Sequence, residues 1–272
     1  MQDDECPVYE LFHETSKLNE ISEHDMSVRI GALYEDPARL AACRTAFKVY
    51  PYARRIDLPA VAVSETTLTE VLARRRSVRQ FEEGPVTLGE LSSLLRFSYG
   101  ITGGLESNGE VVQKVRAAPS AGGLYPIEIY PVLLSCQGAP AGVYHYNVAQ
   151  NAIELLREGS FRAEISSAMP AQFSLNTAAA VIVLSAAFGK TTHKYGERGY
   201  RFVLLDAGHV MQNLYLTVTA ARLGCYSVGG FRDDEMDSLL GLDGASETAL
   251  YACVMGRPTK ASDADAAGAS EH

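Results

Sequence analysis

The sequence predicts an α+β fold in which helices cover a central sheet that is antiparallel or mixed. Strand and helix signals do not alternate regularly along the chain, as they would in a βαβ series. Several short runs are apolar throughout, which is typical of strands buried on both faces. Residues 200–223 contain no proline and are apolar on nearly every helical face, which indicates a central helix buried in a large core or between subunits.

Composition narrows the class of protein. The 272 residues, 47% of them hydrophobic and 21% charged, suffice for one large domain or two small ones. A net charge of −9 without a basic tract argues against nucleic acid as a partner. The five cysteines lack metal-ligand spacing, so we expect reduced thiols, no metal site and a cytoplasmic location. The N-terminus is too polar for a signal peptide, and the longest apolar run, 178–187, is too short to span a bilayer.

Three segments are distinguished along the chain. Residues 1–60 are predicted to form an N-terminal extension, with one helix over 9–17 and an extended link over 52–59. Residues 61–260 carry most of the remaining signals and are predicted to form the main domain. The tail, 261–272, is small and polar and is predicted to be disordered.

Capping boxes mark the first two helices of the main domain. Thr67 and Thr87 each precede a glutamate by three residues, which is the capping-box pattern. We therefore expect helices over 67–75 and 87–99. The polar, glycine-containing residues 101–116 that follow are predicted to be a mobile loop that faces the substrate.

Strands and shorter helices complete the predicted domain. Strand signals cover residues 127–135, 142–147, 152–156, 178–187 and 249–256, the second and third forming a hairpin. A helix is expected over 160–168. After the central helix, the sequence predicts a turn at Gly229-Gly230-Phe231 and a short helix that Asp233 caps and that ends at about Leu240.

A cluster of arginines follows the first capped helix. In an extended segment Arg75, Ser77 and Arg79 point the same way, because alternate side chains share a face. Two guanidiniums and a hydroxyl suit a phosphate monoester, and Arg257 after the last strand could add a third cation. The alternative is a solvated basic turn that is favoured by the dipole of the preceding helix.

Other phosphate-binding motifs are absent. No G-x-G-x-x-G follows a predicted strand, and the Gly-Lys-Thr at 189–191 lacks a P-loop because Leu184 stands in place of the first glycine. Ser120 has no evident base, so we expect it to donate a hydrogen bond rather than to act as a nucleophile. The small residues within 116–126 would let a flat ligand approach the backbone closely.

Several motifs occur in order along the chain: LFHETSK, RRRSVRQF, RAAPSAGGLYP, GVYHYN, KYGERGYRFVLLDAGHVMQNLYL, VGGF and VMGRP. Each is weak alone. Together, over about residues 8–257, they resemble the FMN-dependent nitroreductase-like superfamily, and within it the SagB-type peptide dehydrogenases that oxidise azolines. The resemblance implies a nitroreductase-like α/β sandwich that forms an obligate homodimer and binds FMN.

The resemblance also implies that both subunits build each flavin site. One subunit would hold the phosphate and ribityl chain and donate backbone hydrogen bonds to the isoalloxazine, and the second would line the flavin. The residues implied are Arg75, Ser77, Arg79 and Arg257 for the phosphate and ribityl chain, Gly229 and Gly230 for the isoalloxazine, and Pro119, Ser120, Ala121 and Gly122 from the second subunit.

A lysine–tyrosine pair precedes the central helix. Lys194 and Tyr195 match in place the catalytic pair of the azoline dehydrogenases. Aromatising a thiazoline removes a hydride, which the flavin would accept at N5, and a proton, which Lys194 would take. Tyr195 would orient the substrate or donate a hydrogen bond. The alternatives are a solvated lysine in a surface loop and a lysine paired with Glu197 or with the dimer partner.

The function expected from the resemblance is an FMN-dependent dehydrogenase that converts thiazoline or oxazoline rings to thiazole or oxazole, with O2 reoxidising the flavin. The substrate would be a peptide or peptide-like intermediate, delivered by a cyclodehydratase or a carrier protein. Two alternatives are an NAD(P)H-dependent reductase of nitro compounds, quinones or flavin, and a flavin-free scaffold subunit of a biosynthetic complex.

Overall fold

The computed structural model describes residues 7–45, 47–61, 65–107, 109–170 and 172–259, so the predicted tail lies outside the described residues. Its centre is an eight-stranded sheet in the order β1-β9-β8-β6-β10-β12-β11, with β2 beside β12. The pairings described in this sheet are antiparallel, which confirms the predicted α+β class. The strands are β1 Arg54–Asp57, β2 Phe81–Glu82, β6 Ile127–Leu133, β8 Gly142–Asn147, β9 Ala152–Glu158, β10 Ala180–Ala187, β11 Gly224–Val228 and β12 Glu247–Pro258.

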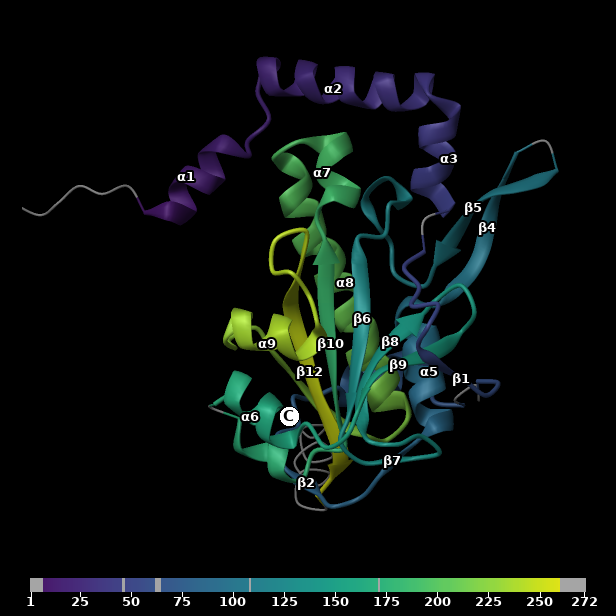
Figure 1. The fold of residues 1–272 in the computed structure, drawn as a ribbon, viewed down its shortest axis with the longest axis vertical. Helices are drawn as coiled ribbons and strands as arrows, with labels where there is room; N and C mark the ends of the chain where they lie inside the picture. Colours follow the sequence, from purple (N-terminus) through teal and green to yellow (C-terminus); the bar gives the residue numbers. More distant parts are fainter. Residues whose placement is uncertain (1–6, 46, 62–64, 108, 171, 260–272) are drawn as a thin grey trace, which may run out of the picture.

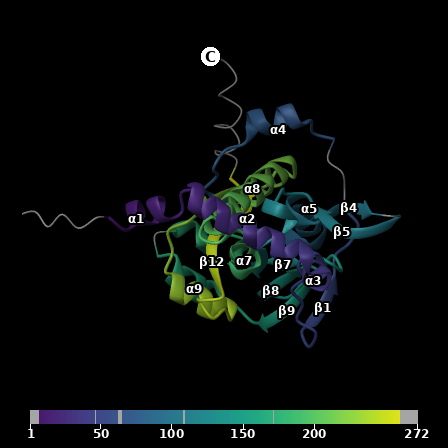
Figure 2. The ribbon, with the colours of Figure 1, turned by 90° about the horizontal axis from the view of Figure 1, so that it is seen from above.

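Helices cover both faces of the sheet, as Figures 1 and 2 show. Helices α5 and α8 pack on one face through one hydrophobic cluster, and α6 and α9 pack on the other face through a second cluster. Strand β6 shows why two clusters form: Ile129 points into the first and Tyr130 into the second, because neighbouring side chains alternate. The helices are α1 Val8–Thr15, α2 Glu20–Glu35, α3 Pro37–Thr45, α4 Leu68–Arg74, α5 Leu88–Tyr99, α6 Arg162–Ala168, α7 Gly189–Tyr195, α8 Arg198–Ala220 and α9 Asp233–Leu240.

Both predicted capping boxes are present. The Thr67 hydroxyl accepts from the Glu70 amide at 3.3 Å, and the Glu70 carboxylate accepts from the Thr67 amide at 2.8 Å. Thr87 and Glu90 repeat the arrangement at 3.1 and 2.7 Å. These reciprocal bonds satisfy amide groups that a helix start otherwise leaves without partners, so α4 and α5 begin where the sequence predicted.

The prediction of a mobile loop over 101–116 is wrong. This segment is a hairpin of β4 (Ile101–Ser107) and β5 (Glu110–Arg116) that projects beside the sheet (Figure 1). The sequence carries Asn108-Gly109 between the two strands, which is a strong hairpin signal, and Gly109 adopts the positive φ of 81° that such turns favour. The polar composition hid this signal because most of the hairpin is exposed.

The central helix and α9 differ from prediction in detail. Helix α8 is apolar but not buried all round, since Leu204 and Leu205 on one face are exposed in the single chain. Asp233 does not cap α9. Arg232 occupies the capping position without a side-chain bond, and Asp233 lies in the first turn, where its charge favours the helix dipole.

The N-terminal extension folds onto the main domain. Its helices α2 and α3 lie across the end of the sheet at which α7 sits, and its strand β1 pairs with β9 at the sheet edge (Figures 1 and 2). Helix α2 buries only Leu33, so it rests on the domain with a largely exposed surface. No described helix has the length and hydropathy to cross a bilayer.

Candidate active site

The arginine cluster lies in an extended segment that runs beside β11. The Val78 amide donates to the Cys225 carbonyl at 2.8 Å, which fixes the segment against the strand. Its side chains then reach tyrosines of the core: the Arg75 guanidinium lies 5.4 Å from the centre of the Tyr215 ring, and that of Arg79 lies 5.5 Å from the centre of the Tyr226 ring. Tyr215 belongs to the first hydrophobic cluster and Tyr226 to the second, so the two guanidiniums lie over rings on opposite faces of the sheet rather than on the one face that the alternation predicted.

Neither guanidinium of this cluster is neutralised. Within the described ranges no carboxylate forms an ion pair with Arg75 or Arg79. The Arg79 guanidinium donates to the Ser77 carbonyl at 3.3 Å, and each arginine otherwise lies on an aromatic ring. Most of their donors stay available for an anion, which is what bidentate recognition of a phosphate requires.

A hydroxyl network connects Ser77 with β11 and β12. Ser77 Oγ lies 3.2 Å from Tyr215 Oη, which accepts from the Ser227 amide at 2.8 Å, and Tyr251 Oη donates to Ser227 Oγ at 2.9 Å. No local pattern in the sequence indicates this network, because its members come from the Ser77 segment, α8, β11 and β12.

The glycine pair that follows β11 leaves its backbone open. Gly229 and Gly230 are exposed, and a methyl group at Gly230 would meet no atom within 4 Å. At Gly229 such a group would meet only the Tyr251 ring, at 3.9 Å. A flat ligand can therefore approach this backbone closely.

Arg257 lies at the end of β12, where it is paired. Its guanidinium binds both oxygens of Glu90 at 2.7 and 2.8 Å and donates to the Pro85 carbonyl at 3.0 Å. Burial disfavours the charged form of Glu90, but the Arg257 and Thr87 hydrogen bonds hold its pKa below the ordinary value. The structure thus gives this arginine a carboxylate partner, unlike the two arginines of the cluster.

The loop that was predicted to line the flavin is held by α8. Ser120 Oγ donates to Asp206 Oδ2 at 2.5 Å, and the Ala121 amide donates to Oδ1 at 3.3 Å. Ser120 Oγ also accepts from the Tyr125 amide at 2.9 Å. Pro119 immediately precedes this anchor, and a short 3-10 turn of residues 121–123 follows it.

Asp206 was missed by sequence reasoning. Its side chain is buried, and burial raises its pKa while the bonds from Ser120 and Ala121 oppose that rise. A signal was present, because Asp206 is the only aspartate or glutamate in the otherwise apolar run of α8. A buried acid on an apolar helix needs a hydrogen-bond partner, and this partner proved to be the loop at Ser120.

Lys194 and Tyr195 lie in helix α7 rather than in a surface loop. Lys194 is only 6% exposed, and its Nζ lies 5.0 Å from the centre of the Tyr195 ring and 5.4 Å from that of Tyr34. The alternative ion pair with Glu197 is not formed, and no other described carboxylate pairs with this amine.

Gly122 packs against both polar ends of this pair. A methyl group at Gly122 would lie 2.4 Å from Tyr195 Oη and 2.9 Å from Lys194 Nζ, distances that real side chains do not tolerate. The residue also has a φ of 63°, which favours glycine. The fold therefore places the predicted catalytic pair directly beside the predicted flavin-lining loop of the same chain.

The arginine cluster lies far from this pair within one chain. Arg75 lies over Tyr215 near the end of α8, whereas Lys194 and Tyr195 directly precede its start at Arg198. Tyr215 lies 17 positions after Arg198 in the helix, a rise of about 26 Å at 1.5 Å per residue. The predicted phosphate-binding residues and the predicted catalytic pair therefore lie near opposite ends of α8.

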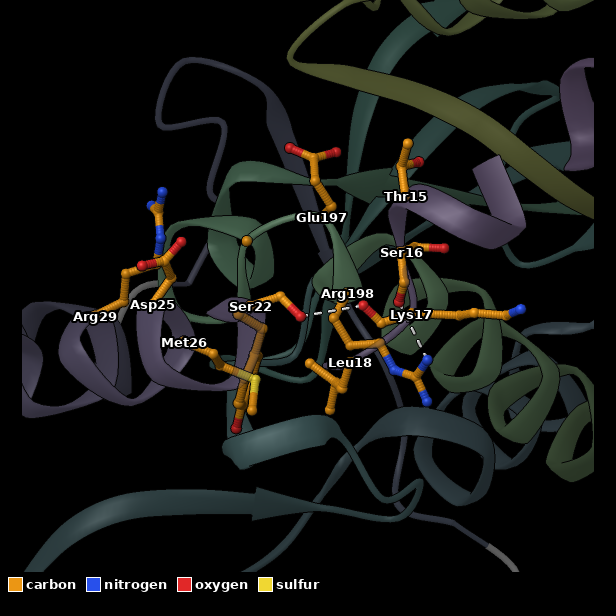
Figure 3. Close-up of a pocket in the computed structure, with 12 residues that line it drawn as sticks. Thr15, Ser16, Lys17, Leu18, Ser22, Asp25, Met26, Arg29, Glu197 and Arg198 are labelled. Carbon is orange, nitrogen blue, oxygen red and sulfur yellow. Dashed lines mark hydrogen bonds between the residues drawn. The ribbon is translucent and has the colours of Figure 1, made fainter. Parts of the chain in front are cut away.

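The extension covers the predicted catalytic pair from outside. A crevice of about 140 Å³ remains between the α1–α2 turn and the turn that joins α7 to α8. Figure 3 shows Arg198 pointing at this turn, where it donates to the Ser16 carbonyl at 3.2 Å, while Ser22 donates to the Lys17 carbonyl at 3.2 Å. A cavity of this size accommodates a benzene-sized group, so it is far too small for a flavin.

Comparison with known proteins identifies the family. The Nitroreductase family matches residues 72–257, well over half of the chain. The chain belongs to this family. A nitroreductase-family protein of Methanocaldococcus jannaschii is 37% identical over 185 residues, which cover 68% of this chain and 88% of that protein.

Two peptide-processing proteins are also similar to the chain. The trifolitoxin-processing protein TfxB of Rhizobium leguminosarum is 32% identical over 157 residues, and the microcin B17-processing protein McbC of Escherichia coli is 30% identical over 133 residues. These matches cover 56% and 47% of this chain. The chain spans about half or less of these two relatives, 41% of TfxB and 49% of McbC.

Solved structures agree on the fold. A nitroreductase-family protein of Anabaena variabilis superposes with a TM-score of 0.71 at 25% identity and covers 95% of this chain, which matches 48% of that one. A chain of the E. coli microcin synthetase McbBCD complex with truncated pro-MccB17 superposes with a TM-score of 0.60 at 21% identity, covering 95% of this chain and 100% of that one. Such identity supports the fold alone.

Among the described residues no group of histidine, cysteine, aspartate or glutamate could hold a metal ion.

Proposed function

We propose that the protein is an FMN-dependent dehydrogenase that oxidises thiazoline or oxazoline rings of a peptide or peptide-like intermediate to thiazole or oxazole. The observation that carries the proposal is the buried amine of Lys194 beside the Tyr195 hydroxyl, both against Gly122. Family membership supports a redox reaction, and the similarity to two peptide-processing proteins supports a peptide substrate.

The residues present fit an FMN. Arg75, Ser77 and Arg79 would hold its phosphate, because neither guanidinium pairs with a carboxylate of the described residues. The open backbone at Gly229 and Gly230 would face its ring system. When bound, the flavin supplies the hydride acceptor.

The chain's own residues would manage the proton. Lys194 Nζ takes the proton that leaves the azoline carbon, since no described carboxylate competes for this amine. Tyr195 Oη donates a hydrogen bond that orients the ring. Helices α2 and α7 shield the amine from water, because Tyr34 of the extension lies over it.

We further propose a homodimer in which each flavin site draws on both subunits. The Arg75 and Lys194 half-sites lie near opposite ends of α8 in one chain, so the Lys194 half of one protomer would complete the Arg75 half of its partner. The exposed apolar face of α8 supplies an interface, with Leu204 43% and Leu205 60% exposed in the single chain.

The proposal is tested with purified protein, reconstituted with FMN, and a synthetic thiazoline peptide under air. The product should be lighter than the substrate by two hydrogens. Lys194→Ala should lower turnover at least about 100-fold, as expected for loss of a general base, while FMN stays bound. Lys114→Ala, which removes an exposed lysine of β5, is the control. Unchanged turnover in Lys194→Ala would remove the assigned base.

A second candidate is an NAD(P)H-dependent reductase on the same fold. The family match and the 37% identical relative favour it. Such a reductase needs no protein base of the Lys194 type. Rapid anaerobic bleaching of the yellow protein by NADPH, without any azoline turnover, would select this function over the dehydrogenase.

A further inference from the structure

A cysteine and a histidine meet where the extension contacts α7. Cys43 Sγ of α3 lies 3.4 Å from His193 Nε2, and both side chains are half-buried. These residues are 150 positions apart, so only the docking of α3 on α7 brings them together. The pair lies outside the flavin half-sites described above.

The histidine is oriented so that it can act as a base. His193 Nδ1 lies 2.7 Å from the Gly189 carbonyl, which can only accept, so Nδ1 carries the proton. In the neutral ring Nε2 is then the acceptor and faces the Cys43 thiol. This is the arrangement of an activated nucleophile: a thiol, a base and a third group that orients the base.

The surroundings of the pair leave the sulfur accessible and place cationic side chains near it. Cys43 and His193 line an open cavity together with Arg39, Lys190 and Leu124. Arg39 and Lys190 bring positive charge, although Lys190 is paired with Glu128 at 2.7 Å. Cationic neighbours and solvent access are the features that distinguish reactive cysteines from inert, buried ones.

We propose that Cys43 is a peroxide-reactive thiol, with His193 as its base. His193 Nε2 takes the thiol proton, and the thiolate attacks one oxygen of hydrogen peroxide. An S–O bond forms as the O–O bond breaks, and the leaving hydroxide recovers the proton as water. The sulfur is oxidised by two electrons to a sulfenic acid, and the peroxide is reduced by two.

The chain contains its own control. Cys136 is also half-buried, but burial raises its pKa to about 11, and its thiol has no hydrogen bond to a histidine of the described residues. Cys225 and Cys253 are buried. Reactivity should therefore separate by residue within one molecule, and no comparison with another protein is needed.

The experiment exposes the full-length protein to added hydrogen peroxide at neutral pH, traps sulfenic acid with a dimedone probe, and quantifies each cysteine peptide by mass spectrometry. Cys43 should be labelled at least about tenfold faster than Cys136, because a thiolate reacts and a thiol does not. Added peroxide makes the result independent of any flavin turnover. Equal labelling of the two cysteines would overturn the proposal.

Two variants test the base. His193→Asn keeps a donor near the Gly189 carbonyl but removes the nitrogen that faces Cys43, so Cys43 labelling should fall about tenfold or more while Cys136 labelling is unchanged. Cys43→Ser should abolish the signal at that peptide. Should His193→Asn label Cys43 at the wild-type rate, His193 is not the base and the proposal is wrong.

Discussion

At the scale of residues, Gly122 limits the space for Lys194 and Tyr195, the proposed catalytic pair. Its Cα approaches both polar ends so closely that any side chain would displace them. The neighbouring Gly123 has almost the same backbone, with a φ of 64° against 63°, but a methyl group there would meet the flexible Gln113 side chain. Substitutions at the two glycines can therefore distinguish the effect of backbone strain from the effect of contact with Lys194 and Tyr195.

This difference gives the first prediction. Gly122→Ala and Gly123→Ala should each destabilise the protein by about 1 kcal/mol through the positive φ. Only Gly122→Ala should also lower azoline turnover, because it pushes the Lys194 amine aside. Urea unfolding and turnover assays distinguish the two effects. Equal turnover in both variants would show that contact with Gly122 does not matter.

A second residue cluster, unrelated to the flavin half-sites, is built around His145. The imidazole contacts Glu154 at 2.9 Å and Glu128 at 3.3 Å, and Lys190 binds Glu128 at 2.7 Å. Burial opposes the imidazolium, but both carboxylates raise the pKa of His145 above its ordinary value. Burial likewise opposes ionisation of Glu128, but hydrogen bonds and charge from His145 and Lys190 hold its pKa at about 2.

The cluster predicts how stability depends on pH. The raised pKa of His145 stabilises the folded protein below about pH 6.5, and this stabilisation is lost as the pH rises through the pKa of the folded state. The lowered pKa of Glu128 stabilises the folded protein above about pH 4.5, and this stabilisation is lost as the pH falls toward 2. His145→Gln should therefore lower the free energy of unfolding most between about pH 4.5 and 6.5, by about 3–5 kcal/mol, and should lower it less at pH 9. Urea unfolding of both proteins across this range checks it, and a cost that does not vary with pH would contradict it.

Sequence reasoning reached residues with local signatures and missed those defined by contacts. The motifs that contain Arg75 and Lys194 are short sequence patterns. In the structure the first lies against β11 and α8, and the second lies against α2. Asp206 could not be assigned a role, because its partner Ser120 lies 86 residues away. The Tyr215 hydroxyl network was invisible for the same reason.

At the scale of elements, helix starts were the most predictable feature. A capping box is complete within four residues, so its hydrogen bonds follow from the local sequence alone. The β4–β5 hairpin was missed because its composition is polar, although its Asn-Gly turn is a local signal. The positions of α2 and α3 were unpredictable, since they depend on a few contacts with α7.

The N-terminus of α8 holds α1 in place at a cost to α8 itself. Arg201 donates to the His13 carbonyl at 2.6 Å and to Ser16 Oγ at 2.8 Å, and Arg198 adds the bond to the Ser16 carbonyl. Cations at a helix N-terminus oppose the helix dipole, but here they complement the C-terminal carbonyls of α1. We expect the arginines to serve the extension and not α8.

Arg201→Ala should therefore release α1 without unfolding α8. Loss of two bonds from a charged donor, each worth about 1.5–3 kcal/mol, should speed hydrogen exchange over α1 at least about tenfold. Amides within α8 should keep their protection. Arg232→Ala, which removes an exposed arginine on the opposite side of the sheet, is the control. Unchanged exchange over α1 would show that the extension is held by other contacts.

At the scale of the whole molecule, the fold class followed from the order of elements and the apolar central helix. The sequence could not show which face of α8 stays open, because Leu204 and Leu205 look no different from the buried leucine Leu214. That choice depends on where the sheet and α5 lie, and those positions arise only from packing.

The open face of α8 gives a prediction about assembly. Leu205→Glu would place a charge in the proposed interface, so the protein should become monomeric by light scattering and lose FMN. Leu105→Glu on the β4–β5 hairpin, where the leucine is 54% exposed, is the control and should change neither property. A dimeric Leu205→Glu protein would place the interface elsewhere.

The length of α8 has a genetic consequence. Two inactive proteins, one with Arg75→Gln and the other with Lys194→Ala, should rescue each other when expressed together. In a dimer of one protein of each kind, one flavin site contains both substitutions and the other contains neither. Random assortment makes about half of the pairs mixed, so about a quarter of wild-type turnover should return. If each flavin site were built by one chain alone, co-expression would restore no turnover.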